Sequence, residues 1–429
     1  MRRIKIRGGN SLEGEVTVSG SKNSALPILA ATILTSGTNT ITNIPDLLDV
    51  KTMIRVLRAL GVIAEYQEPN SVRVSVNHSV RRVAPYDLVT KMRASFFVIG
   101  PILAKMGLAK VPLPGGCAIG SRPVDIHIKG LKALGAEVTQ EHGFIIMKAD
   151  RLKGSRVYMD FPSVGATETI MMAATLAEGE TLIENAAKEP EIVDLANYLI
   201  KAGARISGVG TEEIKIQGVS QLKAIEYRII PDRIEAGTLM IASAITGGEV
   251  VVHGAVREHV DSTINKLREA NSIVKIEGGS IRVKGGKTKA VNIKTLPYPG
   301  FPTDMQPQFT ALLSLGQGTS VINETVFENR FMHVHELRRM GAEISLEGRT
   351  AIISGVKALE GAPVKSRDLR AGAALILAGL AAEGESLVED IDGHIERGYE
   401  FLDKKLCALG ANIEEVSNIS AVYEEDNLK

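Results

Sequence analysis

An internal repeat is the feature of this sequence that most limits how the chain can fold. An apolar helix, a glycine-containing turn, a β-rich stretch and a second helix follow one another in a segment that recurs throughout. The second helices end at equivalent positions that lie 68 to 74 residues apart: Gly61, Gly135, Gly203, Asn271, Gly341 and Gly410. Six units of about 70 residues therefore fill the chain, and the fold must be assembled from six similar modules.

The third unit shows the order of the elements most clearly. An apolar stretch with helical spacing, Thr167–Ala177, is followed by a turn and a short strand at Thr181–Asn185. A proline then opens an amphipathic helix over Glu191–Ala202, and Gly203 occupies the position of a left-handed cap. The fifth and sixth units repeat this order, so each module is predicted to be of β-α-β-α-β-β type.

The first helix of each unit is almost entirely apolar, as in Ala371–Ala382, whereas the second helix has one apolar face. A helix that is apolar all round must be buried on every side, and a single unit cannot cover it. Several units must therefore pack together with their first helices inside. Two arrangements remain open at this point, an open solenoid of six units or two closed clusters of three units each.

The composition excludes two classes of protein. The chain carries 50 Lys and Arg residues against 50 Asp and Glu residues, with 9 Phe, 8 Tyr and no Trp. Nucleic-acid-binding proteins normally show a basic excess and aromatic stacking platforms, so we expect no nucleic-acid partner. The longest apolar run, Ala371–Ala382, is shorter than the roughly 18 residues that a transmembrane helix requires, so we expect no membrane partner.

The cysteines and the first residues of the chain bear on its location. Cys117 and Cys407 lie far apart, which gives no disulfide framework and no CxxC metal pair. The basic start of the chain leads into Gly-Asn-Ser-Leu-Glu and not into an apolar region, unlike a signal peptide. We therefore expect a cytoplasmic protein, and the sequence leaves its oligomeric state open.

Lys22 and Asn23 follow Gly20 and Ser21 directly before an apolar helix. Backbone N–H groups at a helix N-terminus, together with a lysine, suit a phosphate or a carboxylate. The glycine spacing and the asparagine after the lysine exclude a Walker A loop. An ordinary Gly-Ser turn with a solvated lysine is the alternative, so this segment alone leaves anion binding open.

The segment from Val111 to Ile126 is rich in proline and glycine and has no helical or strand periodicity, so we expect a surface loop. Cys117 lies between its glycines and should be accessible. A nearby cation such as Arg122 would stabilise the thiolate and make Cys117 a nucleophile or a proton donor. Cys407, on a predicted helix among leucines, is expected to be an inert residue of the core.

Two prolines rigidify the approach to Asp304, so we expect a carboxylate held on a loop ahead of the apolar helix of the fifth unit. Such a carboxylate can accept a proton from a hydroxyl, although helix capping is a competing interpretation. No carboxylate completes a metal-ligand set around His333 and His335, so no metal site is predicted. Four arginines at matching element boundaries suit two-pronged binding of carboxylate or phosphate: Arg93, Arg330, Arg370 and Arg397.

Five long motifs then resemble those of one protein family, in the same order along the chain. They are GSKNSALPILAA (Gly20–Ala31), LPGGCAIGSRPVD (Leu113–Asp125), SVGATETIMMAA (Ser163–Ala174), FPTDMQPQFT (Phe301–Thr310) and FENRFMH (Phe327–His333). The family is that of the UDP-N-acetylglucosamine 1-carboxyvinyltransferases, bacterial enolpyruvyl transferases of peptidoglycan synthesis. The resemblance extends from Arg3 to Glu415.

The resemblance implies an α/β fold called an inside-out α/β barrel, with two domains that each contain three β-α-β-α-β-β units around buried helices. The active site is expected in the cleft between the domains. The implied domain limits are residues 22–229 for the domain with the Cys117 loop, and residues 1–21 plus 230–429 for the domain with Asp304 and Arg397.

The implied reaction transfers the enolpyruvyl group of phosphoenolpyruvate to the 3′-hydroxyl of UDP-N-acetylglucosamine and releases phosphate, without a metal or other cofactor. Cys117 would donate a proton to the methylene carbon and would be the target of the antibiotic fosfomycin. Asp304 would bind the sugar hydroxyl and accept its proton. Lys22, Arg122 and Arg397 would hold the phosphate, which gives Lys22 and Arg397 a catalytic role, and Arg330 and Arg370 would hold the carboxylate. The UDP-sugar would lie along Asn23, Arg93, Arg122, Pro123, Val124, Asp125, Ile126, Ser163, Val164, Gly165 and Val326.

The sequence departs from the family pattern at Phe161 and Pro162, because many relatives have a lysine two residues before the Ser-Val-Gly motif. One contact to the diphosphate is therefore not expected here. Two alternatives remain open. One is the related shikimate-pathway enolpyruvyl transferase, which lacks the Pro-Gly-Gly-Cys loop. The other is a non-catalytic UDP-sugar-binding relative or repeat scaffold, which would need no reactive thiol and should carry polar capping repeats.

Overall fold

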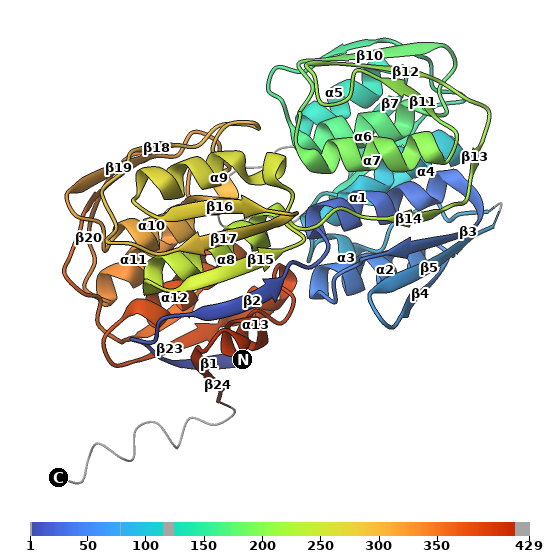
Figure 1. Ribbon diagram of the computed structural model, residues 1–429. Helices are drawn as coiled ribbons and strands as arrows, with labels where there is room; N and C mark the ends of the chain where they lie inside the picture. The colour runs from blue at the N-terminus through green and yellow to red at the C-terminus, as the bar shows by residue number, and fades with distance from the viewer. Residues whose placement is uncertain (1, 78, 115–123, 417–429) are drawn as a thin grey trace.

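The computed structural model describes residues 2–77, 79–114 and 124–416 (Figure 1). The described strands form six sheets of three to five strands each, and each sheet belongs to one of the predicted units. In the third unit the elements follow the predicted β-α-β-α-β-β order, with the first helix on the inside and the second closer to the surface. The repeat in the sequence is therefore a repeat in the structure.

The first three units occupy one half of the molecule. The first contains α1 (Lys22–Ala31), η1 (Thr32–Leu34), β3 (Thr35–Thr42), α2 (Leu48–Ala59), β4 (Ile63–Gln67) and β5 (Ser71–Val76). The second contains α3 (Tyr86–Val89), η2 (Arg93–Val98), α4 (Ile99–Met106), β6 (Leu108–Pro112), α5 (Asp125–Ala133), β7 (Glu137–Glu141) and β8 (Phe144–Lys148). The third contains β9 (Arg156–Tyr158), α6 (Val164–Ala174), β10 (Glu180–Glu184), α7 (Pro190–Lys201), β11 (Arg205–Ser207) and β12 (Glu213–Gln217), and is followed by β13 (Leu222–Lys223) and β14 (Glu226–Arg228).

The other three units form the second half. The fourth contains β2 (Glu13–Thr17), α8 (Arg233–Thr246), β15 (Glu249–His253), α9 (Arg257–Glu269), β16 (Ile273–Glu277) and β17 (Ser280–Lys284). The fifth contains β18 (Ile293–Lys294), η3 (Thr303–Met305), α10 (Gln306–Leu313), β19 (Thr319–Asn323), α11 (Met332–Arg339), β20 (Glu343–Glu347) and β21 (Thr350–Ser354). The sixth contains β22 (Pro363–Ser366), α12 (Leu369–Ala381), β23 (Glu385–Asp390), η4 (Ile391–Gly393), η5 (Ile395–Arg397), α13 (Leu402–Ala408) and β24 (Asn412–Glu415), and β1 (Arg2–Arg7) joins its sheet.

The buried apolar residues form two clusters. One draws its residues from positions 25–229, and the other from positions 4–18 and 234–409. We call them the first core and the second core. An open solenoid would place every unit around one continuous core, so the two separate cores favour two groups of three units.

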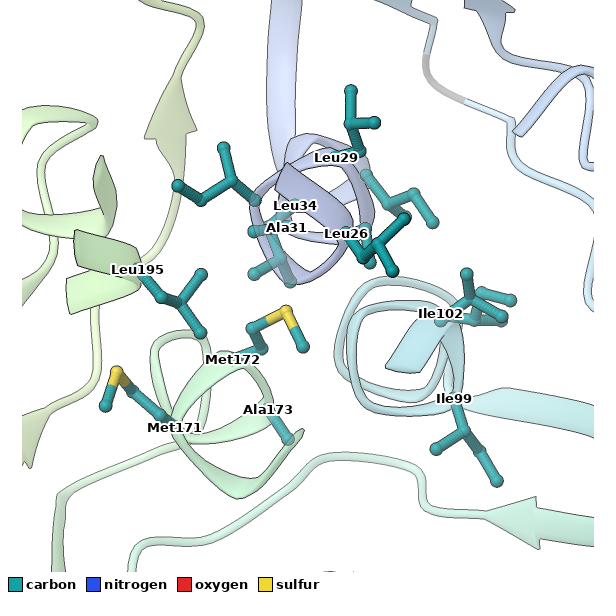
Figure 2. Packing of buried hydrophobic residues seen from close by; sticks show 14 of the residues in the cluster. Leu26, Leu29, Ala31, Leu34, Ile99, Ile102, Met171, Met172, Ala173 and Leu195 are labelled. Atoms are coloured by element: carbon teal, nitrogen blue, oxygen red, sulfur yellow. The ribbon is translucent and has the colours of Figure 1, made fainter. Parts of the chain in front are cut away.

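The apolar first helices meet inside these cores. Figure 2 shows α1, α4 and α6 side by side in the first core, with Leu26 and Ile102 facing each other and Met172 between the helices. In the second core α8, α10 and α12 contact one another in the same way. Every residue of α12 from Arg370 to Leu380 is buried. The prediction that the first helices are buried on every side is confirmed for α12, whereas the last three residues of α4, Ala104–Met106, are half-buried. Each buried Leu, Ile or Met contributes about 1.5–3 kcal/mol.

Strands from distant parts of the sequence complete the sheets. β1 pairs antiparallel with β23 and β24, and β2 pairs parallel with β15. In the first half of the molecule, β13 and β14, which follow the third unit, pair parallel with β3 of the first unit. The chain thus passes between the two cores twice, and the two passages meet in a β-bridge between Gly20 and Pro231. A Cβ at Gly20 would lie only 1.6 Å from the Asn43 carbonyl oxygen, so this close approach requires glycine.

Some local predictions are corrected by the structure. The helix predicted at Thr167–Ala177 begins earlier, at Val164, because the Ser163 hydroxyl accepts a hydrogen bond from the Ala166 N–H at 3.4 Å and caps it. Cys407 was expected in the core but is exposed on α13, since Leu402 and Leu406 take the inward face of this short helix. Within the described residues, none of the helices combines the length and apolar character needed to cross a lipid bilayer.

Candidate active site

Lys22 is the first residue of α1 and is only 9% exposed. Ser21 caps the helix, since its hydroxyl accepts a hydrogen bond from the Ser24 N–H at 3.3 Å. The Lys22 ammonium donates to Asp49 Oδ2 at 3.2 Å. Burial lowers the pKa of Lys22 below its ordinary value, and the carboxylate of Asp49 offsets part of that effect. The lysine predicted at a helix N-terminus is therefore enclosed and paired, and not solvated.

Asp49 joins Lys22 to a second predicted site residue. Its Oδ1 accepts a hydrogen bond from Arg397 Nε at 2.8 Å. Asp49 lies in the first turn of α2 and Arg397 ends η5, so the contact links an element of the first core with one of the second. Burial opposes the ionisation of Asp49, but Lys22 and Arg397 together outweigh burial and hold the pKa of Asp49 below its ordinary value.

Asp304 lies between two buried arginines. Its Oδ1 is 2.7 Å from Arg330 Nη2, and its Oδ2 is 3.1 Å from Arg370 Nη2. The segment predicted as a loop is the short 3-10 helix η3, and the residue at the N-cap of α10 is Met305. Asp304 therefore forms ion pairs and is not the cap of α10, which corrects the competing interpretation.

The two arginines are nearly inaccessible, with 3% of Arg330 and 1% of Arg370 exposed. The Arg370 guanidinium lies 5.2 Å from the centre of the Tyr399 ring, which packs beside it. Within the described residues, Nε of Arg330 and both Nε and Nη1 of Arg370 have no hydrogen-bond partner. The two guanidinium groups share the single carboxylate of Asp304, so the group keeps a net positive charge that favours a further anion nearby.

The Lys22 group and the Asp304 group belong to one site. The charges of Arg370 and Asp304 both act on the pKa of Lys22, in opposite directions, so the two groups are electrostatically coupled. Two pairs of cations thus surround one region: Lys22 with Arg397, and Arg330 with Arg370. Each pair is bridged by one carboxylate, Asp49 or Asp304 respectively. Such a region can hold a small ligand with two anionic ends.

Val326 is fixed to the same region through Glu324. The buried Glu324 carboxylate accepts hydrogen bonds from the Val326 N–H at 2.8 Å and from the Thr303 hydroxyl at 2.8 Å. Thr303 also accepts a hydrogen bond from Arg330 Nη1 at 3.1 Å. The turn that carries Asp304 and the segment that carries Val326 are therefore held together by one carboxylate.

A second group of predicted residues gathers where α5, α6 and η2 begin. Arg93 is the first residue of η2, while Asp125 and Gly165 lie in the first turns of α5 and α6. A Cβ at Gly165 would lie 3.1 Å from Nε2 of His127, so the two helix N-termini are close together. Neighbouring helix N-termini favour a polyanion such as a diphosphate. The other predicted members at these starts are Val124, Ile126, Ser163 and Val164, and Asn23 follows Lys22 on α1.

Two residues with notable contacts were not predicted from the sequence. Asp49 lies in an amphipathic helix, where an acidic residue in the first turn is usually explained by the helix dipole. His127 is buried with no partner for Nδ1 among the described residues, and burial together with Arg93 lowers its pKa to about 3. No local pattern distinguishes either residue, because their partners lie on separate elements: Lys22 on α1 and Arg397 on η5 for the first residue, and Arg93 on η2 for the second.

Three predicted residues, Cys117, Arg122 and Pro123, lie outside the described residues. The described chain ends on one side at Pro114, after β6, and resumes at Val124, before α5. Within the described ranges, no group of three or more His, Cys, Asp and Glu side chains is arranged to hold a metal ion.

Comparison with known proteins gives close sequence relatives. The model of the family described as EPSP synthase (3-phosphoshikimate 1-carboxyvinyltransferase) matches residues 6–406. A UDP-N-acetylglucosamine 1-carboxyvinyltransferase 1 from Caldanaerobacter subterraneus subsp. tengcongensis is 56% identical over 404 residues, which are 94% of this chain and 96% of the relative. A UDP-N-acetylglucosamine 1-carboxyvinyltransferase from Geotalea daltonii is 54% identical over 417 residues, which are 97% of this chain and 100% of the relative.

Two solved structures share the fold. The enolpyruvyl transferase NikO from Streptomyces tendae superposes with a TM-score of 0.88 at 24% identity, covering 97% of this chain and 99% of that chain. An EPSP synthase from Acinetobacter baumannii superposes with a TM-score of 0.75 at 19% identity, covering 97% of this chain and 100% of that chain. At such identities the likeness concerns the two-domain α/β fold alone.

Proposed function

The chain belongs to the enolpyruvyl transferase family described as EPSP synthase, and within it to the UDP-N-acetylglucosamine 1-carboxyvinyltransferases, and from this premise we propose its reaction. The protein transfers the enolpyruvyl group of phosphoenolpyruvate to the 3′-hydroxyl of UDP-N-acetylglucosamine and releases phosphate, a step of peptidoglycan synthesis. The observation that carries the proposal is an identity of 54–56% to proteins of this name over 94–97% of the chain.

The two pairs of cations fit the two anionic ends of phosphoenolpyruvate. Lys22 and Arg397, with Arg122, hold the phosphate, and Arg330 and Arg370 hold the carboxylate. The net positive charge of these two arginines around the single Asp304 carboxylate supports the second assignment, because planar guanidinium groups bind carboxylates in a two-pronged manner. Fixed cations also stabilise the negative charge of the departing phosphate, so the proposal needs neither a metal nor another cofactor.

Asp304 and Cys117 supply the base and the acid. The sugar oxygen forms a bond to C2 of phosphoenolpyruvate while Asp304 accepts the hydroxyl proton and the Cys117 thiol gives a proton to C3. The Cys117 thiolate then takes a proton back from C3, which restores the double bond as the C2–O bond breaks and phosphate leaves with the electron pair of that bond. A thiol in this position is also the site at which the epoxide fosfomycin would alkylate the enzyme.

The UDP-sugar lies along the second group of residues, from Asn23 and Arg93 to the starts of α5 and α6, and reaches Val326 near Asp304. The paired helix N-termini support this placement of the diphosphate. Phe161, which is 43% exposed, replaces the lysine of many relatives close to the start of α6. We expect weaker diphosphate binding at this point, without loss of activity.

The finer architecture is part of the same proposal. Each domain is an inside-out α/β barrel, with limits at residues 22–229 and at residues 1–21 plus 230–429. The two separate cores and the two chain passages between them support these limits. The substrates lie in the cleft between the domains, and the protein acts in the cytoplasm.

Release of phosphate tests the proposed reaction. Purified protein with phosphoenolpyruvate should release phosphate only when UDP-N-acetylglucosamine is added. The matched comparison replaces the UDP-sugar by shikimate 3-phosphate, which should give no release. Release with shikimate 3-phosphate would instead assign the shikimate-pathway reaction. Binding of the UDP-sugar without any release would indicate a non-catalytic relative.

A further inference from the structure

Asp49 is the one carboxylate among the described residues that contacts both Lys22 and Arg397, the two described cations that the proposed function assigns to the phosphate. Its Oδ2 pairs with Lys22 Nζ at 3.2 Å, and its Oδ1 pairs with Arg397 Nε at 2.8 Å. The three residues come from α2, α1 and η5. Lys22 and Arg397 lie on elements that are far apart in the sequence. The Asp49 carboxylate therefore fixes the distance between these two cations.

The burial of Asp49 restricts its carboxylate to these two cations. Asp49 is 5% exposed, so its two oxygens have exchanged water for these two cations. Lysine has a flexible four-carbon chain and loses much rotamer entropy when it is fixed, so its direction depends on a partner. Asp49 contacts Nε of Arg397, and among the described residues no hydrogen bond or ion pair engages the two terminal nitrogens, which can therefore bind a ligand.

The same carboxylate affects the charge of Lys22. Burial lowers the pKa of Lys22, Asp49 and Asp304 raise it, and Arg370 lowers it further. These three charged groups lie on α2, η3 and α12. Without Asp49 the balance shifts toward neutral Lys22, because desolvation and Arg370 would face Asp304 alone.

We propose that Asp49 is a positioning residue, which aims Lys22 and Arg397 at the phosphate of the substrate and keeps Lys22 charged. This inference rests on the proposed function. The pair of Asp49 and Arg397 also joins the two halves of the molecule at the phosphate, because Asp49 lies beside the first core and Arg397 beside the second core. A second contact supports the same junction, in which the Asp46 N–H donates to Glu400 Oε1 at 2.6 Å.

A simpler view predicts the opposite outcome, which makes the proposal testable. If Asp49 were merely a negative charge beside two cations, its removal would strengthen the attraction between those cations and phosphate. The variant Asp49→Asn would then have a lower KM for phosphoenolpyruvate. If Asp49 positions the cations, the same variant has a higher KM, by at least about tenfold, because it loses two charge-assisted hydrogen bonds.

The pH dependence of kcat/KM distinguishes the proposed role of Asp49 from a purely structural role, which would leave this dependence unchanged. The alkaline limb of kcat/KM for phosphoenolpyruvate should shift to lower pH in Asp49→Asn, since Lys22 loses its proton more readily. The affinity for UDP-N-acetylglucosamine should stay at the wild-type value. A KM and an alkaline limb that equal those of the wild type, or a lower KM, would overturn the proposal.

Asp46→Asn is the matched control. It removes a carboxylate three residues earlier, whose Oδ1 pairs with Lys51 at 2.6 Å and not with either phosphate-binding cation. Its KM and its pH profile should equal those of the wild type, and a change like that of Asp49→Asn would contradict a specific role. If Asp49→Asn does not fold, Asp49→Glu replaces it. This variant should have a higher KM for phosphoenolpyruvate, but the alkaline limb of its kcat/KM profile should stay at the wild-type pH. A shifted alkaline limb would count against the proposal. If the wild type releases no phosphate, the proposed function itself is wrong. This result differs from failure of the Asp49 proposal, in which the wild type is active and Asp49→Asn behaves like it.

Discussion

Asp304 and Arg370 form an ion pair in which Asp304 Oδ2 lies 3.1 Å from Arg370 Nη2, and the Arg370 side chain is 1% exposed. Arg330 holds the other carboxylate oxygen at 2.7 Å. The proposed base is therefore held by the two groups that are proposed to bind the substrate's carboxylate. Under the proposed function, the carboxylate of phosphoenolpyruvate competes with Asp304 for these two arginines, and Asp304 accepts the proton of the sugar hydroxyl.

Asp304→Asn is expected to reduce turnover by a factor on the order of 10² to 10⁴, because the amide cannot accept the hydroxyl proton. Phospholactate, a saturated analogue of phosphoenolpyruvate, should bind at least as tightly as to the wild type, because the competing internal anion is gone. Phosphate release measures the first effect and titration calorimetry the second. Unchanged turnover would exclude Asp304 as the base.

Cys117→Ser should lose most of its turnover, since a hydroxyl is a much weaker proton donor than a thiol. Cys407→Ser is the control, because Cys407 is exposed on α13 and its Sγ donates only toward the Ile413 carbonyl at 3.6 Å. Fosfomycin should add one equivalent, on the peptide that contains Cys117, as read by mass spectrometry. Modification of Cys407 alone would contradict the assignment.

Phe161→Lys should strengthen the binding of UDP-N-acetylglucosamine by about two- to fivefold at low ionic strength, because it places an exposed cation near the diphosphate. The gain should disappear in high salt. Tyr158→Lys adds the same charge at another exposed position, on β9, and should leave the dissociation constant unchanged. Equal gains in both variants would indicate a general charge effect and not a diphosphate contact.

Glu235 should make the protein less stable as the pH rises through the weakly acidic range. Burial raises the pKa of Glu235 from 4.5 to about 7, although Lys405 and the Ser19 N–H favour its ionised form. The folded state therefore binds a proton that the unfolded state has released between these two values, so the free energy of unfolding falls from pH 4.5 to 7, by about 3 kcal/mol.

The variant Glu235→Gln cannot ionise and should lack this contribution. Thermal unfolding of the wild type and the variant across pH 4.5 to 7 gives the difference directly, since all other titrating groups are shared. The wild type should lose stability relative to Glu235→Gln as the pH rises. A constant difference across this range would show that Glu235 titrates at its ordinary value in the folded protein.

The sequence predicted the units and their buried helices because the signals involved are local. An apolar run such as Ala371–Ala382 has no polar face, and it is the buried helix α12, Leu369–Ala381. Glycine after the second helix of a unit recurs because positive φ there costs glycine little, as at Gly203, where φ is 112°. These properties depend on neighbours within a few residues, which the sequence lists in order.

The ion pairs and the exposure of single side chains depended on the tertiary structure. Asp49 contacts Arg397 across 348 positions of sequence, and Arg370 contacts Asp304 across 66. The direction in which Cys407 points from α13 follows from which face the second core covers. A sequence pattern reports the spacing along one element, whereas a charge pair such as Asp49 with Arg397 requires that two separate elements approach within about 4 Å. That approach is set only when the six units have packed.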